Sequence, residues 1–88
     1  MALPDSNTQF HLVVVSPTEV VYEGNVERLI APGTTQEIAI LPDHTPLYAQ
    51  LQKGNLEIME RANRTKTIAI EGGIIRVKLN QVSVIVGF

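Results

Sequence analysis

Short segments of alternating apolar and polar residues, separated by glycine and proline, run along most of the chain. The clearest alternation lies near its end, where an apolar side chain recurs at every second position in Thr67–Glu71, Ile75–Leu79 and Val82–Val86. Successive side chains of a strand point to opposite faces, so this period of two predicts half-buried strands. Asn80 and Gln81 are the expected turn of a hairpin formed by the last two segments.

Apolar runs earlier in the chain predict further strands, each closed by a residue that favours turns. Proline has a fixed φ and no backbone N–H, and glycine accepts backbone conformations that other residues avoid, so both separate strands. We expect a bulge or a tight strand connection at Gly72 and Gly73. The expected strands are Phe10–Ser16, Val20–Tyr22 ending at Gly24, Val26–Ala31 ending at the Pro32 and Gly33 turn, and Leu47–Leu51.

One segment, Asn55–Glu71, leaves a helix open as an alternative, because it contains no glycine or proline and includes good helix formers. A helix there would need apolar residues at positions that are occupied by Asn63 and Lys66. We therefore expect two strands with a turn near Asn63 and Arg64.

The length and composition fit one small all-β domain. Eighty-eight residues are too few for a second full domain. Ten Val, nine Ile and seven Thr favour strands over helices, because β-branched side chains pack well on a pleated sheet. Eight to ten short antiparallel strands must pack as two sheets or close on themselves, because a single sheet would leave its apolar face in water. A β-sandwich over residues 9–88 is the preferred prediction. Residues 1–8 are expected to form a loose tail.

Charge and residue usage exclude several classes of function. The formal net charge of −2 gives no broad positive field for nucleic acid. The absence of cysteine excludes disulfides and thiolate metal sites. No apolar run approaches the roughly 20 residues of a membrane-spanning helix, and the first residues lack the pattern of a secretory signal.

The segment from Ile30 to Leu51 holds the least generic chemistry, with Asp43 directly before His44. A carboxylate beside an imidazole could serve as a general base or a metal ligand, as in a small hydrolase. We favour a different interpretation, in which Asp43 caps the turn opened by Pro42 and His44 is a loop residue presented to solvent or to a partner. No catalytic, cofactor or metal site is predicted.

Five of the seven basic residues fall between positions 61 and 78, which raises the question of an anion site. Glu60 and Glu71 lie in the same region, so a solvated face is the preferred interpretation. These five residues are Arg61, Arg64, Lys66, Arg76 and Lys78.

Five sequence blocks, taken in order, resemble the epsilon subunit family of the F-type ATP synthases. They extend from about Phe10 to Val86 and read FHLVVVSP, YEGNVERLIAPG, ILPDHTPL, KGNLEI and IEGGIIRVKLNQVSVI. The resemblance implies a flattened antiparallel β-sandwich of about ten strands, in agreement with the pattern of alternation and turns.

The resemblance also implies a role as a non-catalytic rotor subunit that couples rotation of the membrane c-ring to the gamma subunit and thus to ATP synthesis. Such a subunit lies at the cytoplasmic face of the energy-transducing membrane and meets the membrane only through its complex. It needs no cofactor. Carried over by position, the gamma contacts are Ser16, His44, Thr45 and Ala49, and the c-ring contacts are Thr35, Gln36 and Glu37.

The sequence departs from the family pattern in three places. Gln36 and Ala39 stand where the family often has glycine, and Asp43 replaces a frequent glycine before the histidine. A positive φ at Gln36 would strain the turn that faces the c-ring. Many members also continue into a two-helix hairpin that restrains ATP hydrolysis and in some cases binds ATP. The sequence ends at Phe88, so these functions of the hairpin are expected to be absent.

A free-standing β-sandwich module for a small ligand or carbohydrate is the alternative function. Sugar-binding faces use stacked aromatic rings, whereas this chain has two Phe, two Tyr and no Trp.

Overall fold

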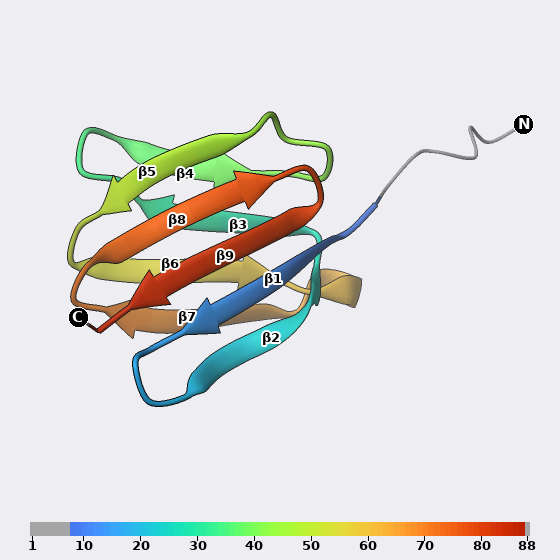
Figure 1. Cartoon of the computed structure of the whole chain (residues 1–88). Coiled ribbons are helices and arrows are strands. Elements are labelled where there is room, and N and C mark those ends of the chain that lie inside the picture. Colours follow the sequence, from blue (N-terminus) through green and yellow to red (C-terminus); the bar gives the residue numbers. More distant parts are fainter. Residues whose placement is uncertain (1–7, 88) are drawn as a thin grey trace, which may run out of the picture.

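The computed structural model describes residues 8–87, which form two β-sheets packed face to face (Figure 1). Within this part of the chain there are nine strands and one short 3₁₀ turn, η1 (Arg61–Asn63). The strands are β1 (Phe10–Val15), β2 (Val20–Val26), β3 (Arg28–Pro32), β4 (Glu37–Ile40), β5 (Leu47–Leu51), β6 (Gly54–Met59), β7 (Thr65–Ile70), β8 (Gly73–Lys78) and β9 (Gln81–Val86).

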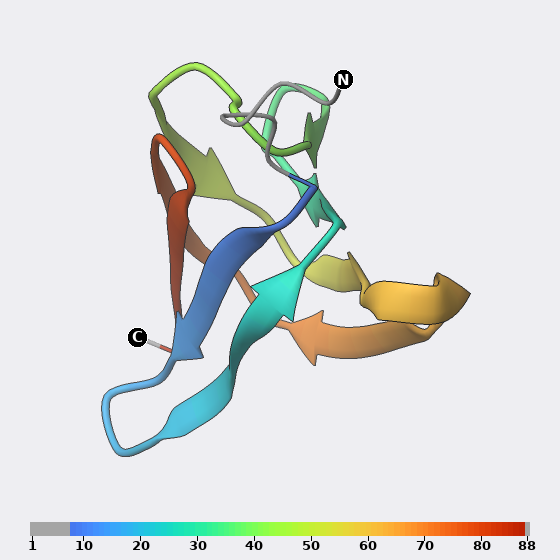
Figure 2. The same ribbon diagram turned by 90° about the vertical axis from the view of Figure 1, so that its right-hand side faces the viewer.

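The first sheet, sheet A, has the strand order β2-β1-β9-β8-β5, and the second, sheet B, has the order β4-β3-β6-β7. Figure 2 shows the two sheets as separate layers. The all-β sandwich predicted from the sequence is confirmed. Neighbouring strands are antiparallel except β1 and β9, which are parallel. These two strands lie far apart in the chain, so no short hairpin forces them to run in opposite directions.

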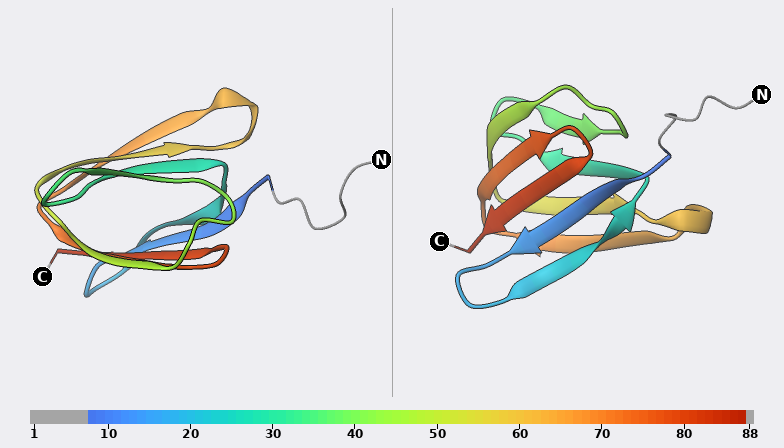
Figure 3. Two further views of the ribbon diagram at one scale, coloured as in Figure 1. Left: turned by 90° about the horizontal axis from the view of Figure 1, so that it is seen from above. Right: turned by 45° about the vertical axis from the view of Figure 1, so that its right-hand side comes forward.

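Figure 3 shows the two sheets as facing layers. The core lies between them and is made of alternate residues of the strands. In β1, Phe10, Leu12 and Val14 are buried while the residues between them are half-buried. No polar or charged residue is buried in the described part of the chain. The core consists of Phe10, Leu12, Val14, Val26, Leu29, Ala31, Ile40, Leu51, Leu56, Ile58, Ile70, Ile75, Val77, Val82, Val84 and Val86.

The segment Asn55–Glu71 forms strands rather than the alternative helix. β6 and β7 pair in antiparallel register from Gly54 opposite Ile70 to Met59 opposite Thr65. Their connection includes η1, so the prediction of two strands with a turn near Asn63 is confirmed. Ala62 and Asn63 both have a φ of 60°, a conformation that ends regular structure for most residues.

Two predicted strand boundaries were wrong because the chain changes sheets between Val26 and Leu29. β2 does not end at Gly24 but continues to Val26, and Gly24 pairs with Leu12 of β1. The expected strand Val26–Ala31 is divided at Glu27, whose backbone N–H donates to the carbonyl of Met59 at 2.7 Å. Val26 and Leu29 are both fully buried, so the apolar run continues while the strand does not.

The C-terminal hairpin is present, but its turn lies one residue earlier than predicted. Lys78 pairs with Gln81, which leaves Leu79 and Asn80 as the turn. Leu79 was expected on the inner face of the strand, yet it is 69% exposed with a φ of 54°. The connection predicted at Gly72 and Gly73 is confirmed. Gly72 has a φ of 138°, and a Cβ on Gly73 would lie 2.3 Å from the carbonyl oxygen of Ile85.

The loose tail predicted for residues 1–8 lies almost wholly outside the described residues, which begin at residue 8.

Candidate functional site

The β3–β4 turn carries the residues predicted to face the c-ring, at the left end of the molecule in Figure 1. Thr35, Gln36 and Glu37 are all exposed. Gly33 is buried at the start of the turn, where an added Cβ would lie 2.3 Å from the carbonyl oxygen of Gln36. Gln36 is not among the described non-glycine residues with positive φ. The sequence departure at Gln36 therefore introduces no strain of that kind.

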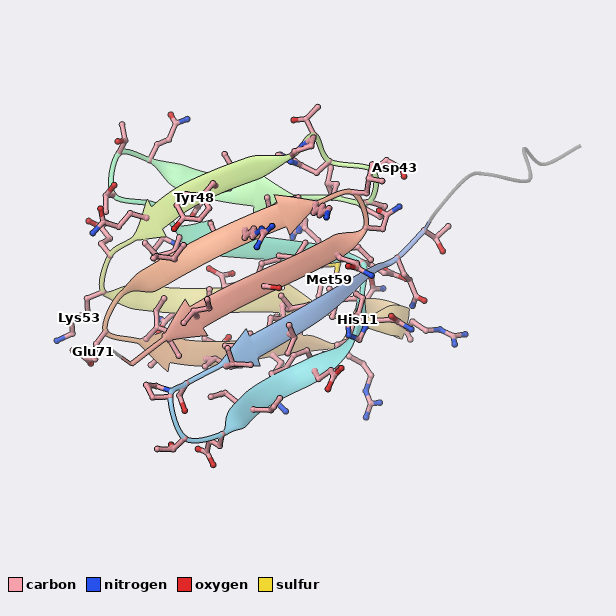
Figure 4. The ribbon with its side chains drawn as sticks, in the orientation of Figure 1. His11, Asp43, Tyr48, Lys53, Met59 and Glu71 are labelled. Carbon is pink, nitrogen blue, oxygen red and sulfur yellow. The ribbon has the colours of Figure 1, made fainter. Side chains whose placement is uncertain are left out.

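The β4–β5 loop holds Asp43, His44 and Thr45 at the opposite end of the sandwich. The side chain of Asn80 in the β8–β9 turn ties this loop down. The N–H of Asp43 donates to Asn80 Oδ1 at 2.7 Å, and Asn80 Nδ2 donates to Asp43 Oδ1 at 2.9 Å. Figure 4 shows Asp43 beside that turn. Asp43, which stands where the family often has glycine, has a φ of 63°. The paired hydrogen bonds hold this conformation in place.

The ring of His44 is half-buried and has a defined orientation. Its Nδ1 lies 2.6 Å from the carbonyl oxygen of Thr45. A carbonyl can only accept a hydrogen bond, so Nδ1 carries the proton and Nε2 is the nitrogen that can meet a partner. The pairing of Asp43 with Asn80 and of His44 with Thr45 fits a recognition loop better than a catalytic pair.

Ser16 lies in the β1–β2 turn, at the same end as the β3–β4 turn and far from His44. Its N–H donates to the carbonyl of Glu19 at 2.9 Å, and its hydroxyl accepts from the N–H of Glu19 at 3.2 Å. Ser16 thus shapes its own turn.

Ala49 lies in β5 with its side chain partly buried against the core. A hollow beside it is also lined by Thr35 and Gln36. The structure therefore places Ala49 next to two predicted c-ring contacts. His44 and Thr45 lie together, while Ser16 is separated from them by the length of sheet A.

Tyr22, Glu60 and Lys66 form a cluster that sequence reasoning missed. The Tyr22 hydroxyl donates to the Glu60 carboxylate, and Lys66 Nζ lies 5.3 Å from the centre of the Tyr22 ring. Burial, the hydrogen bond and the charge of Glu60 raise the pKa of Tyr22 to about 12.

The five basic residues between positions 61 and 78 form no single patch. Arg61, Arg64 and Lys66 lie in β7 or in the connection before it, at the edge of sheet B, whereas Arg76 and Lys78 lie on β8 of sheet A.

Sequence reasoning also missed Asn80 and Tyr48. Asn80 was assigned to a turn, but its contact with Asp43 joins residues 37 positions apart, which no local pattern indicates. Tyr48 could have been found, because alternation along Leu47–Leu51 places it opposite to the inward-facing leucines. It is 71% exposed.

Neither a metal centre nor a membrane-spanning helix is present in residues 8–87. This part of the chain contains no group of three or more His, Cys, Asp or Glu side chains placed to hold a metal ion. It likewise contains no helix with the length and apolar character needed to cross a membrane.

The profile of the family "ATP synthase, Delta/Epsilon chain, beta-sandwich domain" matches residues 9–87, which span both sheets and both candidate loops. The chain belongs to this family. As a delta/epsilon β-sandwich domain it is similar to the ATP synthase epsilon chain of Leptospira borgpetersenii serovar Hardjo-bovis, with 42% identity over 77 residues. That match covers 88% of this chain and 60% of the relative.

A second relative of the delta/epsilon β-sandwich domain is the ATP synthase epsilon chain of Leptospira interrogans serovar Lai. It is 38% identical over 80 residues, which cover 91% of this chain and 62% of the relative. The chain thus spans about three fifths of the length of these relatives.

Solved structures agree on the fold of the delta/epsilon β-sandwich. A chain of the Euglena gracilis mitochondrial ATP synthase (OSCP/F1/c-ring) superposes with a TM-score of 0.85 at 21% identity, covering 97% of this chain and 56% of that chain. A chain of the Tetrahymena thermophila mitochondrial ATP synthase (central stalk/c-ring) gives a TM-score of 0.73 at 20% identity, covering 89% and 63%.

Proposed function

We propose that this domain is the β-sandwich of a non-catalytic rotor subunit of a rotary ATP synthase, where it couples c-ring rotation to the gamma subunit and so to ATP synthesis. The family match over residues 9–87 is the observation that supports this function most directly. The domain acts at the cytoplasmic face of an energy-transducing membrane, which it reaches only through the complex.

Two sets of residues provide the contacts of the domain. The exposed turn at Thr35, Gln36 and Glu37 contacts polar loops of the c-ring, with the Glu37 carboxylate as its charged group. Ser16, His44, Thr45 and Ala49 contact gamma. A contact that transmits torque requires a stiff support, and a close-packed core between two sheets supplies it.

Binding to the gamma subunit of the same organism tests the rotor function. In native mass spectrometry the domain should form a one-to-one complex with gamma, and the interface should bury more than about 1,200 Å². His44→Ala should weaken the complex without unfolding the domain. Thr67→Ala is the matched control, because Thr67 is exposed on the outer face of sheet B. Failure of the unaltered domain to bind gamma would contradict the proposal and favour a free-standing ligand-binding module.

Charge reversal tests the c-ring contact separately. Glu37→Lys should reduce capture of the domain by c-rings in nanodiscs, and added salt should weaken wild-type capture because the exposed charge is screened. Glu57→Lys is the control, since Glu57 is also an exposed carboxylate of sheet B but lies on β6, away from the turn. Equal loss in both variants would argue against a specific role for Glu37.

A further inference from the structure

The connection between β6 and β7 projects from the body of the sandwich, as the gold segment in Figures 2 and 3 shows. It consists of Glu60, the turn η1 and Arg64, and we call residues 60–64 the β6–β7 tip. Residues 61–64 are all exposed. The tip lies at the end of the molecule where β3 begins, because Arg28 pairs with Met59. The β3–β4 turn, which carries Glu37, lies at the opposite end of β3.

Four of the seven basic residues of the chain lie in or beside this tip. They are Arg61 and Arg64 in the tip, Lys66 just after it in β7, and Arg28, which pairs with the residue just before it. All four are exposed. The two ion pairs formed within residues 8–87 involve none of them, so their charges are available to a partner.

The tip has a defined and strained backbone. Ala62 and Asn63 both have a φ of 60°, a left-handed conformation that is unfavourable for alanine. The N–H of Glu60 donates to the carbonyl of Arg64 at 2.6 Å, and the N–H of Arg64 donates to the carbonyl of Arg61 at 3.3 Å. Backbone strain of this kind persists where surrounding contacts impose it, and it is concentrated at functional sites.

Contacts with β2 fix the base of the tip. Glu60, the one carboxylate of the tip, accepts the hydrogen bond of the Tyr22 hydroxyl. Lys66 Nζ lies 5.3 Å from the centre of the Tyr22 ring. The arginines of the tip are therefore presented on an ordered support, and a partner that binds them has less conformational entropy to remove.

The chemistry of the tip selects one class of partner. Guanidinium groups match carboxylates and phosphates, with which they form paired hydrogen bonds. The net charge of −2 disfavours nucleic acid as the source of these anions. The rotor function proposed above places the c-ring, and with it the membrane, at the end that carries Glu37, opposite to the tip. An acidic polypeptide segment is the partner that fits.

We propose that the β6–β7 tip is a binding element for an acidic segment of another protein, whose carboxylates pair with Arg61 and Arg64 in the positive field of Arg28 and Lys66. The tip contains none of the residues that we assign to the gamma and c-ring contacts, so it is an additional site. The preference for a protein over a membrane rests on the proposed rotor function.

An NMR titration of the isotope-labelled whole chain with a synthetic poly-glutamate peptide tests the tip. Amide shifts should saturate and be largest at residues 61–64. Arg61→Glu combined with Arg64→Glu should raise the dissociation constant about 10-fold, because repulsion replaces two exposed charge pairs. Arg76→Glu combined with Lys78→Glu is the matched control, since it makes the same charge change at exposed positions of β8. The control should alter the constant less than about two-fold, because salt screens distant charges.

The shift map of the wild-type chain locates the site even if a variant fails to fold. Largest shifts on β8, or an equal loss of affinity in both double variants, would reveal a general response to positive charge and overturn the proposal. Shifts that do not saturate would also overturn it. Binding of phosphatidylglycerol vesicles in place of the peptide would make the tip a membrane contact and would refute the protein partner.

A separate measurement distinguishes this inference from the rotor function. A chain that binds gamma in native mass spectrometry but does not bind the peptide would retain the rotor function and lose only the tip proposal. A chain that binds the peptide at the tip but does not bind gamma would lose the rotor function and retain the acidic-segment site.

Discussion

The hydroxyl of Tyr22 donates a hydrogen bond to the carboxylate of Glu60, and this bond joins the two sheets. Tyr22 belongs to β2, an edge strand of sheet A, while Glu60 directly follows β6 of sheet B. Lys66 of the edge strand β7 lies over the same ring. The cluster thus closes one side of the sandwich with polar contacts, in a protein whose described core is entirely apolar.

Removal of the Tyr22 hydroxyl should destabilise the domain. Tyr22→Phe should lower the free energy of unfolding by about 1 kcal/mol, because a partly buried hydrogen bond to a charged group is lost. Urea denaturation measures the change. Tyr48→Phe is the control, since Tyr48 is 71% exposed and its hydroxyl has no hydrogen bond partner in the described residues. A double-mutant cycle with Glu60→Gln should show coupling between the two side chains. Additive effects would contradict the contact.

The raised pKa of Tyr22 predicts a specific dependence on alkaline pH. The pKa rises from 10.0 to about 12 in the folded protein, so folding favours the neutral phenol. The resulting stabilisation is fully present below pH 10 and is lost as the pH rises from 10 toward 12. The stability difference between wild type and Tyr22→Phe should therefore be constant from about pH 7 to 9 and shrink above pH 10. A difference that grows above pH 10 would contradict the sign of the pKa shift.

Alternation predicted much of the fold because the apolar face of each strand must meet the core. The hairpin of β8 and β9 and the pair β6 and β7 follow from this rule. The change of sheet at Glu27 could not be predicted, since Val26 and Leu29 are apolar on both sides of it. The parallel pairing of β1 with β9 depends on packing between distant segments, which a local pattern does not contain.

The candidate site was predicted less completely than the fold. Sequence blocks located the turn at Glu37 and the loop at His44, and both lie at ends of the sandwich as exposed or half-buried segments. The bond between Asp43 and Asn80 is a tertiary contact, and the exposure of Leu79 depends on a positive φ. Neither property is determined by residue type alone.

Asn80 is expected to hold the β4–β5 loop in its observed position. Asn80→Ala removes both hydrogen bonds to Asp43 and should reduce stability by about 1 to 2 kcal/mol. Amide hydrogen exchange should accelerate at Asp43 and His44 more than in the strands. Gln81→Ala is the control, because Gln81 is exposed in the same hairpin. Unchanged exchange at Asp43 would show that other contacts hold the loop.

Leu79 should be replaceable with a gain in stability. A branched apolar side chain is unfavourable at a φ of 54°, whereas asparagine accepts this conformation. Leu79→Asn should raise the free energy of unfolding by about 0.5 to 1 kcal/mol, which corresponds to a melting temperature higher by about 2 to 8 °C. Leu41→Asn is the control, because Leu41 is 54% exposed but is not among the described residues with positive φ. A loss of stability in Leu79→Asn would show that the leucine makes contacts that outweigh the strain.

Gly33 should be essential to the shape of the turn that carries Glu37. In Gly33→Ala the new Cβ would lie 2.3 Å from the backbone carbonyl oxygen of Gln36. Because this overlap is with the backbone and not with the end of a flexible side chain, the turn itself would have to shift. We expect a loss of about 1 to 3 kcal/mol in thermal or urea denaturation, the range for a forced steric overlap. Chemical shifts should change most between Gly33 and Glu37, and capture by the c-ring should fall.

Gly24→Ala provides the matched control for this turn. Gly24 also lies in the sandwich, but its added Cβ would be 3.4 Å from the Tyr22 hydroxyl, an ordinary contact distance. Its stability should change by less than about 0.5 kcal/mol, the range for a substitution that disturbs no packed or strained feature. If the two variants were equally stable and equally able to bind the c-ring, the close approach of Gly33 to Gln36 would not determine the geometry of the turn.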